Sequence, residues 1–292
     1  MNSHGAIRFV LKRIFIRKLS IFFAVFVFLT QVLSGCMQLR MSHKKMNRFL
    51  ASSTPPLQSH TYLAEGRKMH YVTMPESDKS PLLFVHGSPG AWDAFKNYFK
   101  RDSLVQNYKL ISVDRPGFGY SDFGRHEPSL EKQAACIAPI LKEQKKPVIL
   151  VGHSLGGPVI ARLAMDYPEH VKGLVFIAPS IDPSLEKTKW IQYPAHWKAT
   201  RWLVPRVLRA CNEEILPLKG ELEKMLPLWK NITVPVVFVQ GGKDNLVPKE
   251  NLDFAKKVLT GTQIKEFFYP EYNHFIPFTH PDIVEKAILQ LP

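Results

Sequence analysis

The chain has 292 residues, 45% of them hydrophobic, and a formal net charge of +14. This composition is sufficient for one large core, and the absence of a repeat of 20–50 residues argues against a solenoid. The excess of basic residues is accompanied by no nucleic-acid recognition motif and no interleaved aromatic platform, so we expect no nucleic-acid partner.

The first 35 residues are typical of a signal peptide. A basic stretch that includes Arg8 and Lys18 precedes the apolar run Ile21–Leu29, and Leu33-Ser34-Gly35-Cys36 follows. This ending resembles a bacterial lipobox, in which the cysteine is lipidated and becomes the mature N-terminus. We therefore predict lipidation at Cys36 and a membrane-anchored lipoprotein, in the outer membrane or facing the periplasm. The alternative is an uncleaved N-terminal anchor in the inner membrane, for which Ile21–Met37 is slightly short.

Residues 36–60 are predicted to be a lipidated tether because they are polar and contain Ser52-Ser53-Thr54-Pro55-Pro56. Four basic residues lie in this segment: Arg40, Lys44, Lys45 and Arg48. Next to anionic lipid headgroups, such charges favour a position close to the membrane. The partner predicted for this part of the chain is therefore a membrane.

Apolar runs alternate with helical patterns from residue 61 to the end. The expected strands are Thr61–Ala64, Lys68–Thr73, Pro81–Val85, Lys109–Val113, Val148–Val151, Val171–Ile177, Val234–Gln240 and Ile264–Tyr269. The expected helices are Ala91–Phe99, Ser129–Gln144, Ser154–Tyr167, Lys249–Leu259 and Pro281–Leu291. This alternation predicts an α/β fold with a mostly parallel central sheet and helices on both faces.

Residues 182–231 interrupt the alternation and are too long for a simple connection. They contain Trp190, Trp197, Trp202 and Trp229. We predict that 182–231 form an inserted helical cap above the strand ends, and that residues 61–181 and 232–292 form the core. The alternative is an additional helical layer away from the site.

Ser154 lies in the sequence Gly152-His153-Ser154-Leu155-Gly156, between a predicted buried strand and a predicted helix. This is the pattern of a nucleophile elbow, a sharp turn that lifts a serine hydroxyl clear of the sheet. A glycine-rich packing turn is the alternative interpretation. A serine needs a base, and an imidazole oriented by a carboxylate supplies one.

Asp244 and His274 are the candidate partners of Ser154. Each follows a later predicted strand, and parallel strands bring their carboxyl ends to one edge of the sheet. Asp182, after the preceding strand, is the alternative acid.

The other histidines are weaker candidates for the base: His280 introduces the last helix, His153 is next to the nucleophile with its side chain directed elsewhere, and His86 is expected to bond to the backbone.

An acyl-transfer reaction also needs donors for the oxyanion. The backbone N–H of Leu155, at the start of the helix, is one candidate. The loop His86-Gly87-Ser88-Pro89-Gly90 supplies the other, with the Ser88 N–H favoured because Pro89 has none. A plain Gly/Pro turn is the alternative for this loop.

Five segments, in order, resemble the α/β-hydrolase superfamily: His86–Gly90, Asp114–Ser121, Gly152–Gly157, Gly241–Asp244 and Asn273-His274. The resemblance covers about residues 61–292 and is closest to the capped branch with an H-G-x-P-G loop. That branch includes esterases, carbon–carbon bond hydrolases, epoxide hydrolases and haloalkane dehalogenases. The last two use an aspartate nucleophile where this chain has Ser154, which argues against both.

The predicted function is that of a serine hydrolase that cleaves a carboxylic ester of a small to medium apolar substrate through an acyl-enzyme. Hydrolysis of a carbon–carbon bond, a thioester or an amide is the alternative, and a non-catalytic binding protein is a third hypothesis. We expect no cofactor and no metal, since no Cys/His spacing indicates a metal site. Cys136 and Cys211 are expected to be free buried thiols, with a disulfide as the alternative. No oligomeric state follows from the sequence.

Overall fold

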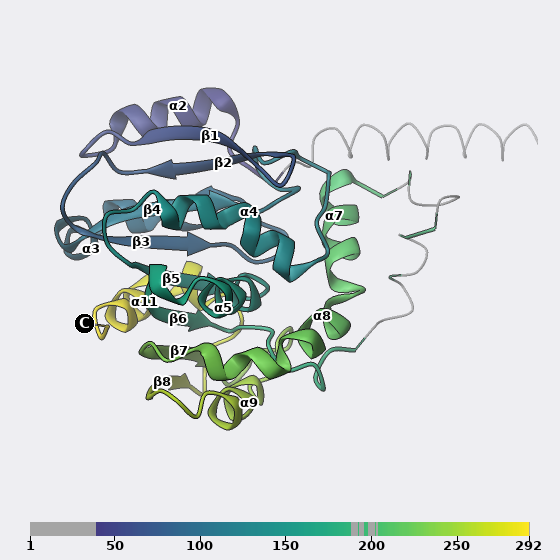
Figure 1. The fold of residues 1–292 in the computed structure, drawn as a ribbon. Helices are drawn as coiled ribbons and strands as arrows, with labels where there is room; N and C mark the ends of the chain where they lie inside the picture. The colour runs from purple at the N-terminus through teal and green to yellow at the C-terminus, as the bar shows by residue number, and fades with distance from the viewer. Residues whose placement is uncertain (1–38, 188–191, 193–195, 198–201, 203, 292) are drawn as a thin grey trace, which may run out of the picture.

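The computed structural model describes residues 39–187, 192, 196–197, 202 and 204–291. Within these residues, eight strands form one sheet in the order β1-β2-β4-β3-β5-β6-β7-β8 (Figure 1). The strands are β1 (Gln58–Ala64), β2 (Arg67–Thr73), β3 (Ser80–Val85), β4 (Tyr108–Asp114), β5 (Val148–His153), β6 (Val171–Ile177), β7 (Val236–Gly241) and β8 (Ile264–Tyr269). Pairing is antiparallel for β1–β2 and β2–β4 and parallel from β4 to β8. The predicted mostly parallel sheet is confirmed.

Helices cover both faces of this sheet. One face packs against α4 (Leu130–Lys142), α5 (Gly156–Asp166) and α9 (Asn251–Val258). The other packs against α2 (His43–Ser52), the 3₁₀ segment η1 (Trp92–Lys100), α3 (Asp102–Asn107), α10 (Ile276–Thr279) and α11 (Pro281–Ile288). Side chains of β3 alternate between the two: Leu83 and Val85 enter the first core, and Leu82 and Phe84 the second. Burial on both faces explains why the central strands are apolar throughout.

Local sequence signals place several boundaries. The turn between β1 and β2 has Glu65 and Gly66 at positive φ, 51° and 64°, the conformation that a tight two-residue hairpin requires. The Ser129 side chain accepts a hydrogen bond from the Lys132 backbone N–H and so caps α4.

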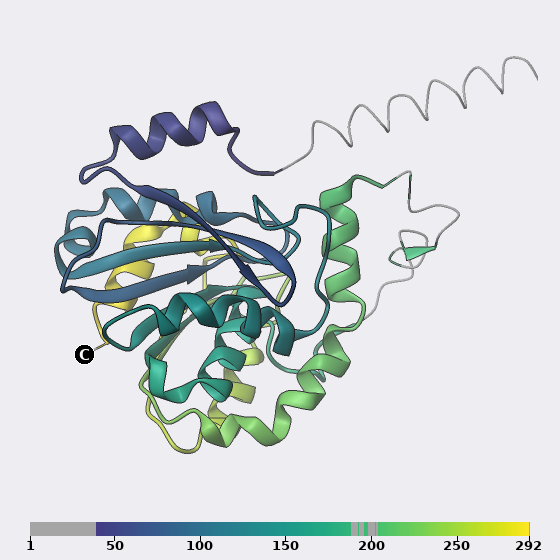
Figure 2. The same cartoon turned by 45° about the horizontal axis from the view of Figure 1, so that its top comes forward.

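The prediction of a tether over residues 36–60 is wrong for much of that segment. Residues 43–52 form helix α2, which lies over the β1–β2 side of the sheet (Figures 1 and 2) and buries Met46 and Leu50 in the second core. The Arg40 guanidinium hydrogen-bonds the Gly119 carbonyl and lies 4.2 Å from the centre of the Tyr120 ring. The amphipathic spacing of Met46 and Leu50 is short and was masked by the surrounding polar and basic residues. Cys36 lies outside the described residues.

The described part of residues 182–231 begins with a turn over residues 183–185 and is mostly helical from residue 206 onward. It contains α7 (Arg206–Ile215), α8 (Leu218–Met225) and the 3₁₀ segment η4 (Leu226–Asn231). Figures 1 and 2 both place α7 beside the carboxyl ends of the parallel strands. Trp197 and Trp202 are exposed, whereas Trp229 packs against Phe254 of α9 in the first core, on the face that α4 and α5 cover. Trp190 lies outside the described residues. None of the helices in the described part of the chain is long and apolar enough to cross a bilayer.

Candidate active site

Ser154 occupies the sharp turn between β5 and α5. Its φ is +54°, a left-handed conformation that costs a residue with a side chain about 1 kcal/mol or more. A Cβ on Gly152 would lie 2.5 Å from the Gly156 carbonyl oxygen, and one on Gly156 would lie 2.2 Å from the Val85 carbonyl oxygen. Both positions therefore require glycine, and the predicted strained turn is present.

His274 and Asp244 form a hydrogen-bonded pair. Nδ1 of His274 lies 2.7 Å from Oδ2 of Asp244, and both side chains are almost fully buried. The second carboxylate oxygen of Asp244 accepts the backbone N–H groups of Leu246 and Val247, at 2.9 and 2.8 Å. Burial alone would raise the pKa of the Asp244 carboxyl, but these hydrogen bonds, together with the one to His274, hold its pKa below the ordinary value. Asp244 is therefore an ionised carboxylate that orients the imidazole.

The structure brings this pair next to the Ser154 turn. The ring of His153, the residue before Ser154, lies 4.7 Å from the ring of His274, and its Nε2 hydrogen-bonds the His274 carbonyl oxygen. Sequence reasoning expected the His153 side chain to point away from the nucleophile but attached no role to it.

The loop after β3 passes directly beside Ser154. A Cβ on Gly87 would lie 2.9 Å from Cβ of Ser154, so only glycine allows this approach. His86 makes the expected backbone contacts: its Nδ1 donates to the Gly87 carbonyl oxygen at 2.7 Å, and its Nε2 accepts the Arg115 N–H at 3.0 Å. Burial, together with the charge of Arg115, holds the pKa of His86 well below its ordinary value, so the ring is neutral. Ser88, the predicted second oxyanion donor, is the next residue of this loop.

The segment after β4 is held by a buried carboxylate. Asp114 accepts hydrogen bonds from the Trp92 and Tyr120 backbone N–H groups, at 2.7 and 2.8 Å, and its Oδ2 lies 2.7 Å from Nδ1 of His70. A Cβ on Gly119 would collide with the Asp114 carboxylate at about 2 Å. These contacts fix the loop from which Arg115 reaches the edge of the site.

Asp182, the alternative acid, makes different contacts. Its Oδ1 accepts the Ser184 backbone N–H at 2.8 Å, and its own N–H donates to the Asn251 side chain at 2.9 Å. The carboxylate thus stabilises a local turn. In the described residues, it is Asp244 that the His274 ring contacts.

The two described cysteines are free and buried. Burial raises the pKa of the Cys136 thiol to about 11 and that of the Cys211 thiol to about 12, so neither is a thiolate near neutral pH. Among the residues with described positions, no three His, Cys, Asp or Glu side chains gather closely enough to hold a metal ion.

Comparisons with known proteins agree with this fold. The family model described as "alpha/beta hydrolase fold" matches residues 80–209. Epoxide hydrolase 4 of Mus musculus is 30% identical over 129 residues, which are 42% of this chain and 35% of that protein. A pimeloyl-acyl-carrier-protein methyl ester esterase of Citrobacter koseri is 27% identical over 249 residues, 72% of this chain and 93% of that protein.

Solved structures share the fold at low identity. The crystal structure of a membrane phospholipase A superposes with a TM-score of 0.62 at 17% identity, covering 97% of this chain and 98% of that one. The chain spans about a third of the length of the epoxide hydrolases and acylglycerol-phosphate acyltransferases that it matches. The chain has the α/β-hydrolase fold, and its relatives include esterases and epoxide hydrolases.

Proposed function

We propose that this protein is a serine hydrolase that cleaves a carboxylic ester of a small to medium apolar substrate. The observation that carries the proposal is the 2.7 Å hydrogen bond between Asp244 and His274, formed beside the strained turn that presents Ser154. A buried carboxylate on Nδ1 fixes the tautomer that leaves Nε2 free to take a proton. Such an arrangement activates a serine hydroxyl.

The reaction proceeds in two steps. Ser154 Oγ attacks the ester carbonyl carbon while His274 takes its proton, and the backbone N–H groups of Leu155 and Ser88 bind the oxyanion. His274 then gives the proton to the leaving alkoxide, which departs as the alcohol. Water, deprotonated by His274, attacks the acyl-enzyme carbonyl carbon. The bond to Ser154 Oγ then breaks, His274 returns the proton to Oγ, and the acid is released. The roles need no cofactor.

The identity of the nucleophile favours one of the reactions that the similar proteins catalyse. Ser154 stands where the epoxide hydrolases and haloalkane dehalogenases of the resembling branch use aspartate, so an ester is favoured over an epoxide. Similarity to a methyl ester esterase over most of that protein supports the same choice. Hydrolysis of a thioester, an amide or a carbon–carbon bond on the same residues is the competing function.

A fluorophosphonate probe tests the proposal, because it phosphonylates an activated serine. Wild-type protein should be labelled at Ser154 and should hydrolyse p-nitrophenyl esters, while Ser154→Ala should do neither and keep its thermal stability. Residual catalysis of about 10³-fold over water through the oxyanion donors is compatible with this result. A series of acyl chain lengths, with matching thioesters and anilides, would identify the bond. Wild-type turnover in Ser154→Ala would refute the assignment.

The N-terminal segment leads to a proposal for the location of the protein in the cell. Cys36, after Leu33-Ser34-Gly35, is the proposed lipid attachment site of a membrane lipoprotein, and an uncleaved inner-membrane anchor is the alternative. Arg40 is fixed on Tyr120 and Phe123, which follow β4. The proposed tether between lipid and domain is therefore shorter than the sequence indicated.

A further inference from the structure

Arg115 is a completely buried cation that joins three parts of the chain. Its Nε donates to the His86 carbonyl oxygen at 2.8 Å, and its Nη2 donates to the Gly87 carbonyl oxygen at 3.1 Å. Nη1 and Nη2 bind the two carboxylate oxygens of Glu214 on α7, at 2.9 and 3.2 Å. Gln133 of α4 completes the set by accepting from Nη1 at 2.8 Å.

Two of these partners, His86 and Gly87, belong to the loop that lies against the proposed nucleophile, Ser154. Gly87 is the residue whose Cβ would collide with Ser154, and Ser88 is the proposed oxyanion donor. The Ser88 hydroxyl is buried and makes no hydrogen bond within the described part of the chain. It lies near α7, because it opposes the rise in the pKa of Glu214 and of Cys211 that burial causes. The backbone of this loop is thus connected to α7 through Arg115 and Glu214.

The chemistry of the Arg115–Glu214 ion pair points to a role beyond stabilising the fold. A buried ion pair loses its hydration and is often no more stabilising than apolar residues of similar size. The guanidinium of Arg115 is a planar fork with donors along two edges. One edge binds the Glu214 carboxylate, and the other binds two consecutive carbonyl oxygens. A lysine ammonium, a point charge, cannot reproduce this geometry.

We propose that Arg115 is a positioning residue that sets the geometry of the oxyanion loop and, through Glu214, couples that loop to helix α7. The inference rests on the proposed serine hydrolase function. Displacement of α7 would move the guanidinium and with it the His86–Ser88 backbone. The placement of the oxyanion donors therefore depends on the position of α7, which belongs to the predicted cap, residues 182–231.

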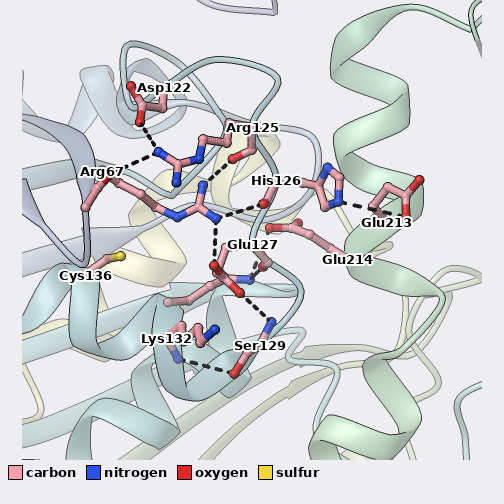
Figure 3. Close-up of polar contacts among 12 residues, drawn as sticks. Arg67, Asp122, Arg125, His126, Glu127, Ser129, Lys132, Cys136, Glu213 and Glu214 are labelled. Atoms are coloured by element: carbon pink, nitrogen blue, oxygen red, sulfur yellow. Dashed lines mark hydrogen bonds and ion pairs between the residues drawn. The ribbon is translucent and has the colours of Figure 1, made fainter.

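A second buried pair in the same chain provides a matched control. Arg67 also binds two consecutive carbonyls, those of Arg125 and His126 at 2.7 and 3.2 Å, and the carboxylate of Glu127 at 2.7 Å (Figure 3). Its partners are on the loop that precedes α4, and the contacts of Arg67 do not include the His86–Ser88 loop. The Glu127 backbone carbonyl also accepts a hydrogen bond from Gln133, and a change of the Glu127 side chain leaves that contact in place. Loss of the Arg67–Glu127 ion pair should therefore cost stability without moving an oxyanion donor.

The experiment compares Glu214→Gln with Glu127→Gln, normalised to the sites that a fluorophosphonate labels. Glu214→Gln should lower kcat for a p-nitrophenyl ester by about 10- to 100-fold with KM changed less than about twofold, because displacement of a catalytic group by about 1 Å has effects of this size. The affinity of a boronic acid, whose tetrahedral adduct places an oxygen in the oxyanion site, should fall in parallel. Glu127→Gln should change neither quantity.

A double variant separates positioning from stability. Arg115→Met combined with Glu214→Leu replaces the pair with apolar side chains and should fold, since such replacements are often neutral. We expect this stable protein to keep the low kcat and weak boronate affinity. Full activity in the double variant, or equal losses in Glu214→Gln and Glu127→Gln, would overturn the positioning role. A wild-type chain that neither labels nor hydrolyses esters would instead overturn the proposed function, and the positioning role with it.

Discussion

His153, the residue before the proposed nucleophile, holds the backbone of the proposed base: its Nε2 lies 3.0 Å from the carbonyl oxygen of His274. Burial, and to a lesser extent the nearby His274 ring, lowers the pKa of His153 to about 3. The ring is therefore neutral near pH 7, and its Nε2–H donates to the carbonyl. One side chain thus connects the turn of Ser154 to the loop of His274.

Loss of this hydrogen bond should impair catalysis. His153→Phe retains an aromatic ring that can pack against Phe278 but removes the donor to the His274 carbonyl. We expect kcat to fall by about 10-fold or more, because the loop that carries the imidazole would shift. The exposed His60 provides the control, since His60→Phe should leave kcat unchanged. Steady-state kinetics on a p-nitrophenyl ester measure the effect, and an unaltered kcat in His153→Phe would contradict it.

The buried neutral histidines make the fold sensitive to acid. His153 stays neutral when folded down to about pH 3, but in the unfolded chain it binds a proton below about pH 6.5. The unfolded state therefore binds more protons between these values, and the free energy of unfolding falls as the pH falls. His86, whose pKa is also lowered by burial, acts in the same direction. For His153 we expect a loss of about 2 kcal/mol by pH 5.

Urea unfolding at pH 7.5 and pH 5 measures this loss. His153→Phe removes one titrating group, so its free energy of unfolding should depend less on pH than that of the wild type. An identical pH dependence in both proteins would show that His153 is not buried in its neutral form.

The acid of the proposed triad can be assigned by two matched variants. Asp244→Asn should lower kcat by about 10⁴-fold, since an amide holds the imidazole in the wrong tautomer. Asp182→Asn should be mild, because its carboxylate caps a turn at Ser184. Kinetics of the two purified variants decide between them. The reverse order of effects would move the acid to Asp182.

Helix α2 should contribute to the stability of the domain. Leu50→Ala removes a side chain from the core that α2 shares with η1, and we expect the free energy of unfolding to fall by about 2 kcal/mol. Leu63→Ala, at a position 81% exposed, should have little effect. Chemical denaturation monitors both. Equal stability of the two variants would indicate that residues 43–52 are a tether after all.

Lipidation should depend on Cys36. A single acyl chain binds membranes only marginally, whereas a diacylglyceryl cysteine followed by a basic segment supplies two signals. Cys36→Ser should block palmitate incorporation and leave an unprocessed precursor in the inner membrane, with the hydrolase domain still folded. Mass spectrometry of the wild-type protein is the decisive measurement, and residues 1–35 found intact would favour an uncleaved anchor.

The order of elements and the candidate triad could be predicted because their signals are local. Buried parallel strands are apolar throughout, and the crowding at Ser154 admits only glycine at positions 152 and 156. Chain order then placed Asp244 and His274 after later strands, and parallel pairing brought those strand ends together. Helix α2 was missed because its short apolar face is recognisable only against the core that it covers.

By itself, the sequence determined which strands form the sheet and which serine lies in the strained turn, since each depends on neighbouring residues or on chain order. It offered His274 as the base and Asp244 as the acid with Asp182 as the alternative, and the contact of Asp244 with the His274 ring came only from the structure. Only the tertiary structure decided that His153 supports His274 and that Arg115 joins the oxyanion loop to Glu214. These contacts connect positions 121 and 99 residues apart. No periodicity or motif encodes such a distance, because the pairing arises from how the elements pack rather than from what surrounds each residue along the chain.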